Sequence, residues 1–362
     1  MQPDVSSARR PRLTPAIADI RRAVRAALVA PLNQNDGESA GSGHKAAISG
    51  SHGEKSVVFD KALVLVGLSG GADSLALAAA TNFEAPRAGI QAGVVIVDHG
   101  LQEGSSHVAA QAAQQARDLG LNPVLVKRVV VSGENDGGPE AAAREARYGA
   151  FAEALAETGA SAVLLAHTLD DQAETVLLGL ARGSGAASLQ GMAPQNGPYL
   201  RPLLGIRRAT TRQFCVDSRL EPWDDPQNLD PAYARVRVRQ SSLPTLEADL
   251  GPGIAEALAR TAEQLREDAD ALDAMIVETI EDICEHAEAG ISVSVGALAA
   301  NPPALRHRII RYVAQSEFGV SLERVHTLAV ARLVTDWHGQ EGLDLPGVRV
   351  VRQGGRVIFT RA

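Results

Sequence analysis

The sequence predicts an α/β protein with a doubly wound parallel sheet, followed by a C-terminal helical domain. Between residues 62 and 181, short apolar runs alternate with amphipathic segments, which is the βαβα order of a parallel sheet. Polar clusters directly follow three of these runs, at Ser69–Ser74, Asp98–Gly100 and His167–Asp171. Beyond residue 247, apolar residues recur every three or four positions, which is the spacing of helices.

The segment before the sheet predicts one helix and a flexible insertion. We expect residues 1–12 to be disordered. Leu13–Leu32 places apolar residues at helical spacing, with arginines on the other side. We expect this helix to pack on the following domain; the alternative is a helix on a membrane surface. Asn33–Ser56 is polar and rich in glycine and serine, which is typical of a flexible segment.

The predicted sheet begins after residue 57, and its elements alternate regularly. The expected strands are Ala62–Leu68, Ala92–Val97, Pro123–Val131 and Ala162–Ala166, and the expected helices are Ser74–Asn82, Ser106–Leu119, Glu140–Thr158 and Asp170–Leu180. Because ligands of such sheets bind beyond the carboxyl ends of the strands, the three polar clusters indicate one site.

The remaining chain predicts loops, helices and a terminal hairpin. Further helices are expected at Ile206–Leu220, Ile254–Glu288, Leu305–Gln315 and Leu322–Thr335, with a loop at Glu221–Pro231 and a hairpin at Val348–Phe359 that turns at Gly354-Gly355. We therefore expect residues 1–56 to precede two domains, which comprise residues 57–246 and 247–362.

Composition excludes several classes of protein. The two cysteines among 362 residues cannot form a disulfide scaffold or a four-cysteine metal site, and such sparse usage suits a cytoplasmic protein. We expect no signal peptide and no membrane span, because no run of about 18 apolar residues occurs. The net charge of −8 argues against a general nucleic-acid binder, although arginines gather locally near residues 201–212, 235–239 and 306–311.

The Ser-Gly-Gly-Ala-Asp-Ser turn at 69–74 predicts a site for a phosphate group. A strand, a glycine-rich turn and a helix N-terminus together expose backbone N–H groups to an anion. Asp73 is unexpected beside phosphates, and it suggests a divalent metal ion that shares them. The turn lacks the lysine of a Walker A loop and the pattern of a dinucleotide site.

This turn resembles the PP-loop of the N-type ATP pyrophosphatases, whose fold is similar to the adenine nucleotide alpha hydrolases. The resemblance implies cleavage of ATP between the α and β phosphates. It also implies that His99 and the six loop residues bind ATP; the loop residues are Ser69, Gly70, Gly71, Ala72, Asp73 and Ser74.

Six further blocks, in family order over residues 62–246, resemble the tRNA(Ile)-lysidine synthetases. The blocks are Val97–Leu101, Glu140–Tyr148, His167–Thr175, Arg182–Gly185, Arg201–Leu204, and Asp225–Asn228 followed by Arg235, Arg239 and Pro244. The resemblance implies ATP-dependent ligation of L-lysine to the wobble cytidine of tRNA(Ile) with a CAU anticodon. Adenylation of the base oxygen would precede attack by the lysine amine, and AMP and pyrophosphate would be released.

The resemblance also implies roles for individual residues. Asp73 and Asp171 would hold Mg²⁺, and His167 and Arg147 would join them in catalysis. The implied tRNA contacts are Arg144, Arg201, Arg207, Arg235 and Arg239. The family is often dimeric, so a homodimer is an open option, although the sequence shows no interface.

Structural explanations compete with several of these roles. Asp170 and Asp171 open a helix, so either could simply cap it. Arg144 and Arg147 could pair with neighbouring glutamates, and His99 could be a core histidine. The family usually has asparagine where this chain has Val236, so any contact of that side chain is in doubt.

Two other functions stay open at this point. A PP-loop tRNA thiolase is one, although such enzymes usually need paired cysteines and Cys215 and Cys284 are isolated in sequence. A non-catalytic module that senses ATP is the other, although Asp73, His167 and Asp171 argue against it.

Overall fold

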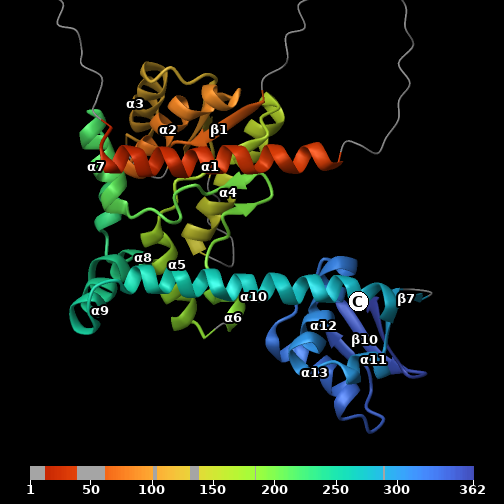
Figure 1. The fold of residues 1–362 in the computed structure, drawn as a ribbon. Helices are drawn as coiled ribbons and strands as arrows, with labels where there is room; N and C mark the ends of the chain where they lie inside the picture. The colour runs from red at the N-terminus through yellow and green to blue at the C-terminus, as the bar shows by residue number, and fades with distance from the viewer. Residues whose placement is uncertain (1–12, 39–61, 101–103, 131–137, 184, 288–289) are drawn as a thin grey trace, which may run out of the picture. The chain divides into compact units, whose positions relative to one another are not determined.

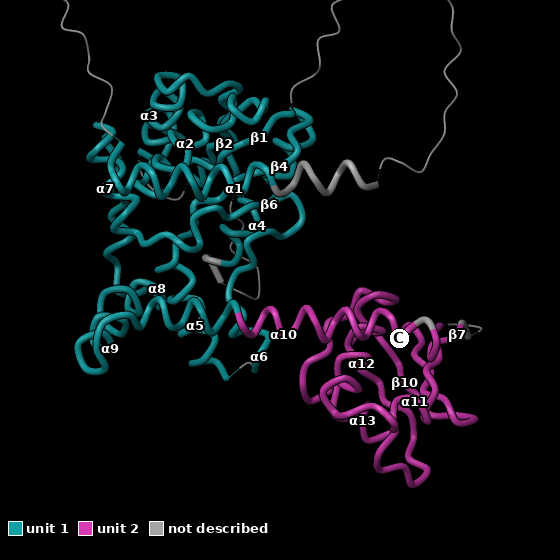
Figure 2. Tube along the Cα trace, viewed as in Figure 1, with its two compact units in different colours: residues 1–263 teal, residues 264–362 magenta. Residues whose placement is uncertain are grey.

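The chain forms two compact units, Met1–Glu263 and Gln264–Ala362, in the computed structural model (Figure 2). The structure describes residues 13–38, 62–100, 104–130, 138–183, 185–287 and 290–362. Each unit has its own sheet and its own hydrophobic core. Among the described residues, no helix has both the length and the apolar character that crossing a bilayer requires.

The first unit contains a six-stranded sheet in the order β3-β2-β1-β4-β6-β5. The strands are β1 (Leu63–Gly67), β2 (Gln91–Asp98), β3 (Val124–Arg128), β4 (Ala162–Leu164), β5 (Gln195–Asn196) and β6 (Tyr199–Leu200). All neighbours pair in parallel except β5, which is antiparallel to β6. The predicted doubly wound sheet is confirmed. Its strand order reverses between β1 and β4, where such sheets bind their ligands.

The predicted helices of the first unit are present to within a few residues at each end, except that the first helix ends at Glu38 instead of Leu32 (Figure 1). Two short helices, at 186–189 and 234–237, were not predicted. The helices of this unit are α1 (Pro15–Glu38), α2 (Ala72–Glu84), α3 (Ser105–Asp118), α4 (Gly138–Thr158), α5 (Leu169–Ala181), α6 (Ala186–Leu189), α7 (Arg208–Ser218), α8 (Ala234–Arg237) and α9 (Leu243–Leu250). Single turns η2 (Ala85–Ala88), η3 (Pro226–Leu229) and η4 (Val238–Ser242) lie between them, and α10 (Ile254–Ile283) begins in this unit.

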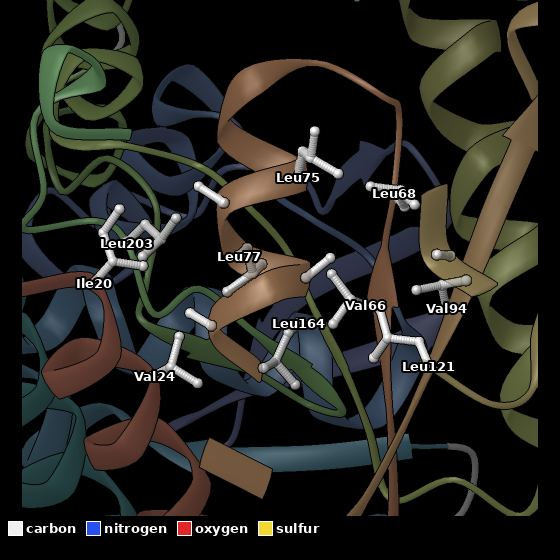
Figure 3. Packing of buried hydrophobic residues seen from close by; sticks show 14 of the residues in the cluster. Ile20, Val24, Val66, Leu68, Leu75, Leu77, Val94, Leu121, Leu164 and Leu203 are labelled. Atoms are coloured by element: carbon white, nitrogen blue, oxygen red, sulfur yellow. The ribbon is translucent and has the colours of Figure 1, made fainter. Parts of the chain in front are cut away.

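Alternate residues of the strands pack on opposite faces of the sheet. Val64 and Val66 of β1 belong to the cluster that contains α1, α2, α3 and α7, part of which Figure 3 shows. Leu65, between them, packs against Phe151 on α4. The parallel strands are therefore covered on both faces, which explains why their sequences are continuously apolar.

Helix α1 packs on the first unit, as predicted. Its residues Ile20 and Val24 are fully buried beside α2 (Figure 3). Arg25 also pairs with the buried Glu84 of α2 at 2.8 Å. The helix extends to Glu38 and so includes the first residues of the predicted insertion. The rest of that insertion, and the segment 1–12 that we expect to be disordered, lie outside the described residues.

Gly93 in β2 is required by its close neighbours. A Cβ atom there would meet the Pro123 carbonyl oxygen at 2.6 Å. Gly93→Ala is expected to destabilise the first unit by about 1–3 kcal/mol, the usual cost of overpacking. Gly149→Ala in α4 is the control, because nothing lies within 4 Å of its Cβ and alanine favours helix. Urea unfolding of both variants measures the difference, and equal stabilities would contradict this packing.

The second unit combines helices with a five-stranded antiparallel sheet in the order β7-β8-β11-β10-β9. Its helices are the end of α10, α11 (Val295–Ala300), α12 (Pro303–Phe318) and α13 (Arg324–Thr335), and its strands are β7 (Cys284–Ala287), β8 (Gly290–Ser294), β9 (Leu343–Leu345), β10 (Val348–Gln353) and β11 (Arg356–Arg361). The predicted hairpin is confirmed as β10 and β11. The helix expected to reach residue 288 ends at Ile283, because the chain there turns into β7.

Candidate active site

The glycine-rich turn joins β1 to α2 at the reversal point of the sheet. Gly70 has a φ of +85°, a left-handed conformation that glycine adopts without strain. Its carbonyl oxygen accepts a hydrogen bond from the Trp223 N–H at 2.9 Å, which fixes the turn from outside. The backbone of the turn is therefore fixed at the carboxyl end of β1 by a contact from a distant segment of the chain.

The serines of the turn shape it from inside. The Ser74 hydroxyl donates to the Gly71 carbonyl at 3.0 Å and accepts from the Ser69 N–H at 3.1 Å. Gly71 is the N-cap of α2, and no side chain caps that helix. The N–H groups of its first turn are thus suited to bind an anion such as a phosphate.

Asp73, in the first turn of α2, faces α7. Its Oδ1 accepts a hydrogen bond from the Thr211 hydroxyl, and its Oδ2 lies 3.6 Å from Nε of Arg208. Burial raises the pKa of Asp73, and the bond from Thr211 and the charge of Arg208 oppose that rise. The acid predicted beside the phosphate cradle is therefore paired with a cation.

The two acids of His167–Asp171 have different structural roles. Thr168 is the N-cap of α5, and Asp171 completes a reciprocal capping box with it. Asp170 instead accepts the Arg208 N–H at 2.7 Å, which caps α7 rather than its own helix. Although burial opposes its ionisation, the charge of Arg208 and the hydrogen bonds from Thr168 lower the pKa of Asp171. Capping and function are thus compatible for Asp171, whose Oδ1 is turned to Arg208 at 2.7 Å.

Glu174 is a site residue to which the sequence analysis gave no role. It lies one turn after Asp171 on α5, and its side chain is 0% exposed. Arg239 contacts both of its carboxylate oxygens, at 2.7 and 3.0 Å, and Arg208 contacts Oε1 at 3.1 Å. The spacing of Asp171 and Glu174, three apart on one helix, was the signal that could have revealed it.

We call Asp73, Asp171, Glu174, Arg208 and Arg239 the charged cluster. It joins three acids from two helices to two arginines that the sequence analysis had placed among the basic segments. One oxygen of Asp73 and one of Asp171 face the same guanidinium, so both point toward one position. Two carboxylates fit Mg²⁺, which takes its other ligands from water and substrate phosphates. Among the described residues, no three His, Cys, Asp or Glu side chains are arranged so that together they could hold a metal ion.

His167 and His99, the two histidines of the predicted site, both have lowered pKa values and are mainly uncharged at neutral pH. Burial, together with the nearby Arg201 and Arg144, lowers the pKa of His167 to about 4 despite the opposing charge of Asp171. Burial also lowers the pKa of His99, whose Nε2 lies 3.5 Å from Nε of Arg147. His167 can therefore donate or accept a hydrogen bond near pH 7, but it carries no charge.

The predicted tRNA-contacting arginines divide into different environments. Arg201 is 6% exposed and donates to the Ala193 carbonyl and to the Tyr148 hydroxyl, at 2.9 and 3.3 Å. Arg144 is exposed and stacks over the Tyr148 ring at 4.9 Å. Their roles toward tRNA stay predictions.

Three more of these arginines lie around α5. Arg207 pairs with Asp170 and Glu256 at 3.4 and 3.2 Å, and Arg239 belongs to the charged cluster. Arg235 lies 3.4 Å from the Thr175 hydroxyl. Val236 is buried, 6% exposed, and so packs inward at the position where the family usually has asparagine.

The parallel sheet and the glycine-rich turn define a PP-loop domain, and residues 47–246 match the family model of that domain. Residues 294–358 match the model of the TilS substrate binding domain. The chain is 67% identical over 299 residues to tRNA(Ile)-lysidine synthase of Leifsonia xyli subsp. xyli, which covers 82% of this chain and 90% of that protein. It is 52% identical over 308 residues to the Streptomyces coelicolor tRNA(Ile)-lysidine synthase, with coverages of 82% and 85%. The chain belongs to the tRNA(Ile)-lysidine synthase family.

A solved structure is also similar in fold. It is the U34-tRNA thiolase NcsA from Methanococcus maripaludis, with a TM-score of 0.51 and 19% identity over 70% of this chain and 80% of that chain. At this identity the similarity concerns the fold alone.

Proposed function

We propose that this protein ligates L-lysine to carbon 2 of the wobble cytidine in the CAU anticodon of tRNA(Ile). The cytidine oxygen attacks the α-phosphorus of ATP, and pyrophosphate leaves. The ε-amine of lysine then attacks carbon 2 of the adenylated base, AMP leaves, and lysidine forms. The modified tRNA reads AUA in place of AUG.

The observation that carries the proposal is the pairing of the PP-loop with two acids at one reversal point of the sheet. The uncapped N-terminus of α2 supplies N–H groups for the phosphates of ATP. Asp73 and Asp171 would hold Mg²⁺, which neutralises charge on the phosphates during cleavage. Their oxygens already face one position, which supports this assignment.

The remaining catalytic assignments follow from charge. Neutral His167 would hydrogen-bond the nucleotide or the reacting base, since burial lowers its pKa to about 4 and leaves the imidazole uncharged near pH 7 before ATP binds. Asp171 would also orient the lysine side chain, because its ionised carboxylate attracts the ε-ammonium before the amine loses its proton and attacks. Arg147, which lies beside His99, would contact the phosphates of ATP or tRNA.

The second unit would contact tRNA through its arginines. Arg306 donates to carbonyl groups of Leu298, Ala299 and Asn301, so it stabilises the unit itself. Arg311 is exposed on α12. Partial burial of its guanidinium and the nearby Arg308 and Arg324 lower its pKa, and Asp273, which pairs with Arg308 at 2.6 Å, opposes them. Positive charges that lie close together in this way attract the phosphates of a nucleic acid. Arg311 is therefore our leading candidate for a backbone contact.

The thiol groups favour the ligase over sulfur transfer. Burial raises the pKa of Cys215 to about 12 and that of Cys284 to about 11, so both thiols are protonated at neutral pH. We expect iodoacetamide at pH 7.5 to leave activity unchanged, because the thiolate is the reactive form. Alkylation should accelerate only as the pH rises toward these values. Rapid inactivation at pH 7.5 would support the thiolase alternative.

Incubation with ATP, Mg²⁺, labelled lysine and tRNA(Ile) bearing CAU tests the proposal directly. Label is expected in the tRNA, with equal amounts of AMP and pyrophosphate, and no label in a tRNA with uridine at the wobble position. Sulfur incorporation without lysine would favour a thiolase. ATP binding without cleavage, for any tRNA, would favour a sensing module.

The location of the protein and its oligomeric state are two further proposals. We propose a cytoplasmic location, where tRNA(Ile), lysine and ATP are available. A homodimer is also an option, and sedimentation velocity of the full chain measures it.

A further inference from the structure

Arg208 lies between the two carboxylates that the proposed function assigns to a metal ion. It is the first residue of α7, and its side chain is 17% exposed. Its Nε lies 3.6 Å from Oδ2 of Asp73, and its Nη2 lies 2.7 Å from Oδ1 of Asp171. One guanidinium therefore faces one oxygen of each acid.

Threonines hold the other oxygen of each acid. Thr211, one turn after Arg208, donates to Oδ1 of Asp73. Thr168 donates to Oδ2 of Asp171 through its N–H at 2.8 Å and its hydroxyl at 2.7 Å. Each carboxylate is therefore anchored through one oxygen, while its other oxygen faces the cation that lies between the two acids and sets their separation.

The net charge of the cluster would suit a divalent cation in the place of Arg208. Three acids, Asp73, Asp171 and Glu174, contact two arginines, Arg208 and Arg239. Arg239 contacts both oxygens of Glu174 and lies 3.5 Å from Oδ1 of Asp171, whereas Arg208 contacts only one oxygen of Glu174. If Arg208 withdraws, three negative charges and one positive charge leave a net charge of −2, which a divalent cation neutralises.

We propose that Arg208 is the built-in counter-ion of Asp73 and Asp171, which occupies the cation position in the ATP-free enzyme and yields it to the metal ion that accompanies ATP. The proposal rests on the proposed function, because that function assigns the two acids to a metal. Arg208 is a positioning residue: it holds two like charges together that would otherwise repel. It also competes with the free metal ion until the phosphates add their own ligands.

Metal binding in the absence of ATP tests this role apart from turnover. Mn²⁺ is the probe, and the free ion is measured by electron paramagnetic resonance with the full chain. In Arg208→Gln the dissociation constant for Mn²⁺ is expected to fall on the order of tenfold, because a positive charge leaves the site. Turnover in lysidine formation is expected to fall at the same time, because the acids lose their fixed separation.

Two further variants separate charge from geometry. Arg208→Lys keeps the charge, so Mn²⁺ binding is expected to stay near the wild-type value, while turnover falls because an ammonium cannot bridge two carboxylates as a planar guanidinium does. Arg212→Gln is the matched control, since Arg212 lies on the same helix and pairs with the exposed Asp224 at 3.6 Å. It should leave Mn²⁺ binding unchanged.

Mn²⁺ binding that is unchanged or weaker in Arg208→Gln overturns the proposal, as does wild-type turnover in that variant. If Arg208→Gln does not fold, Arg208→Lys decides, because tighter Mn²⁺ binding with the charge retained contradicts competition. Failure of the proposed function is distinguishable. A wild-type protein that forms no lysidine, yet shows the Mn²⁺ contrast, rejects the ligase assignment and leaves the counter-ion in place.

Discussion

Asp73→Asn is expected to lower kcat for ATP cleavage by about 10²–10³-fold, the usual loss when one preorganised electrostatic contact to the reacting group is removed. The substitution keeps the size of the side chain and an oxygen that can accept the Thr211 hydrogen bond. It removes the charge that would hold the metal ion against the phosphates. Release of pyrophosphate with saturating tRNA and lysine measures the effect.

The stability of Asp73→Asn should move in the opposite direction. The folded protein raises the pKa of Asp73, so its ionised form lowers stability as the pH rises through the folded pKa. Asparagine cannot ionise, and the variant should unfold at the same or a higher urea concentration at pH 7. Asp224→Asn is the control, because this carboxylate is 83% exposed. More than a tenth of wild-type turnover in Asp73→Asn would exclude the assigned metal role.

The sequence could predict the parts of the site that depend on local order. The strand, glycine-rich turn and helix around residues 69–74 are contiguous, so their geometry follows from nearest neighbours. The convergence of this turn with His167–Asp171 followed from the topology of parallel sheets alone. Both predictions depend on patterns within a single segment or on one general rule.

The partners of individual arginines could not be predicted in this way. Arg207 and Arg208 are adjacent in sequence, yet Arg207 pairs with Asp170 and Glu256, and Arg208 enters the charged cluster. The rotation of α7 about its axis decides between these fates, and packing between distant segments sets that rotation. The strands β7, β8 and β9 escaped prediction for another reason: they contain only three to five residues, too few to establish a period of two.

Glu174→Ala is expected to destabilise the first unit by about 3–5 kcal/mol, the cost of leaving buried charges without their partner. Arg208 and Arg239 have side chains only 17% and 26% exposed, so water cannot replace the lost carboxylate fully. Asp171 would then be the carboxylate that both guanidiniums still contact. Arg208 would also keep its longer contact to Asp73. Urea unfolding of the full chain should show the shift in the transition of the first unit alone.

The exposed ion pair of Lys127 and Glu157 is the control for Glu174→Ala. Glu157→Ala removes the partner of Lys127, and Glu157 is 52% exposed, so a loss of only about 0–1 kcal/mol is expected. Equal losses for the two variants would show that the charged cluster is hydrated and contributes little to the fold. Arg208 would then be free to leave the acids at small cost. A large loss confined to Glu174→Ala means instead that Glu174 and the arginines it contacts form a fixed, poorly hydrated frame beside the two acids.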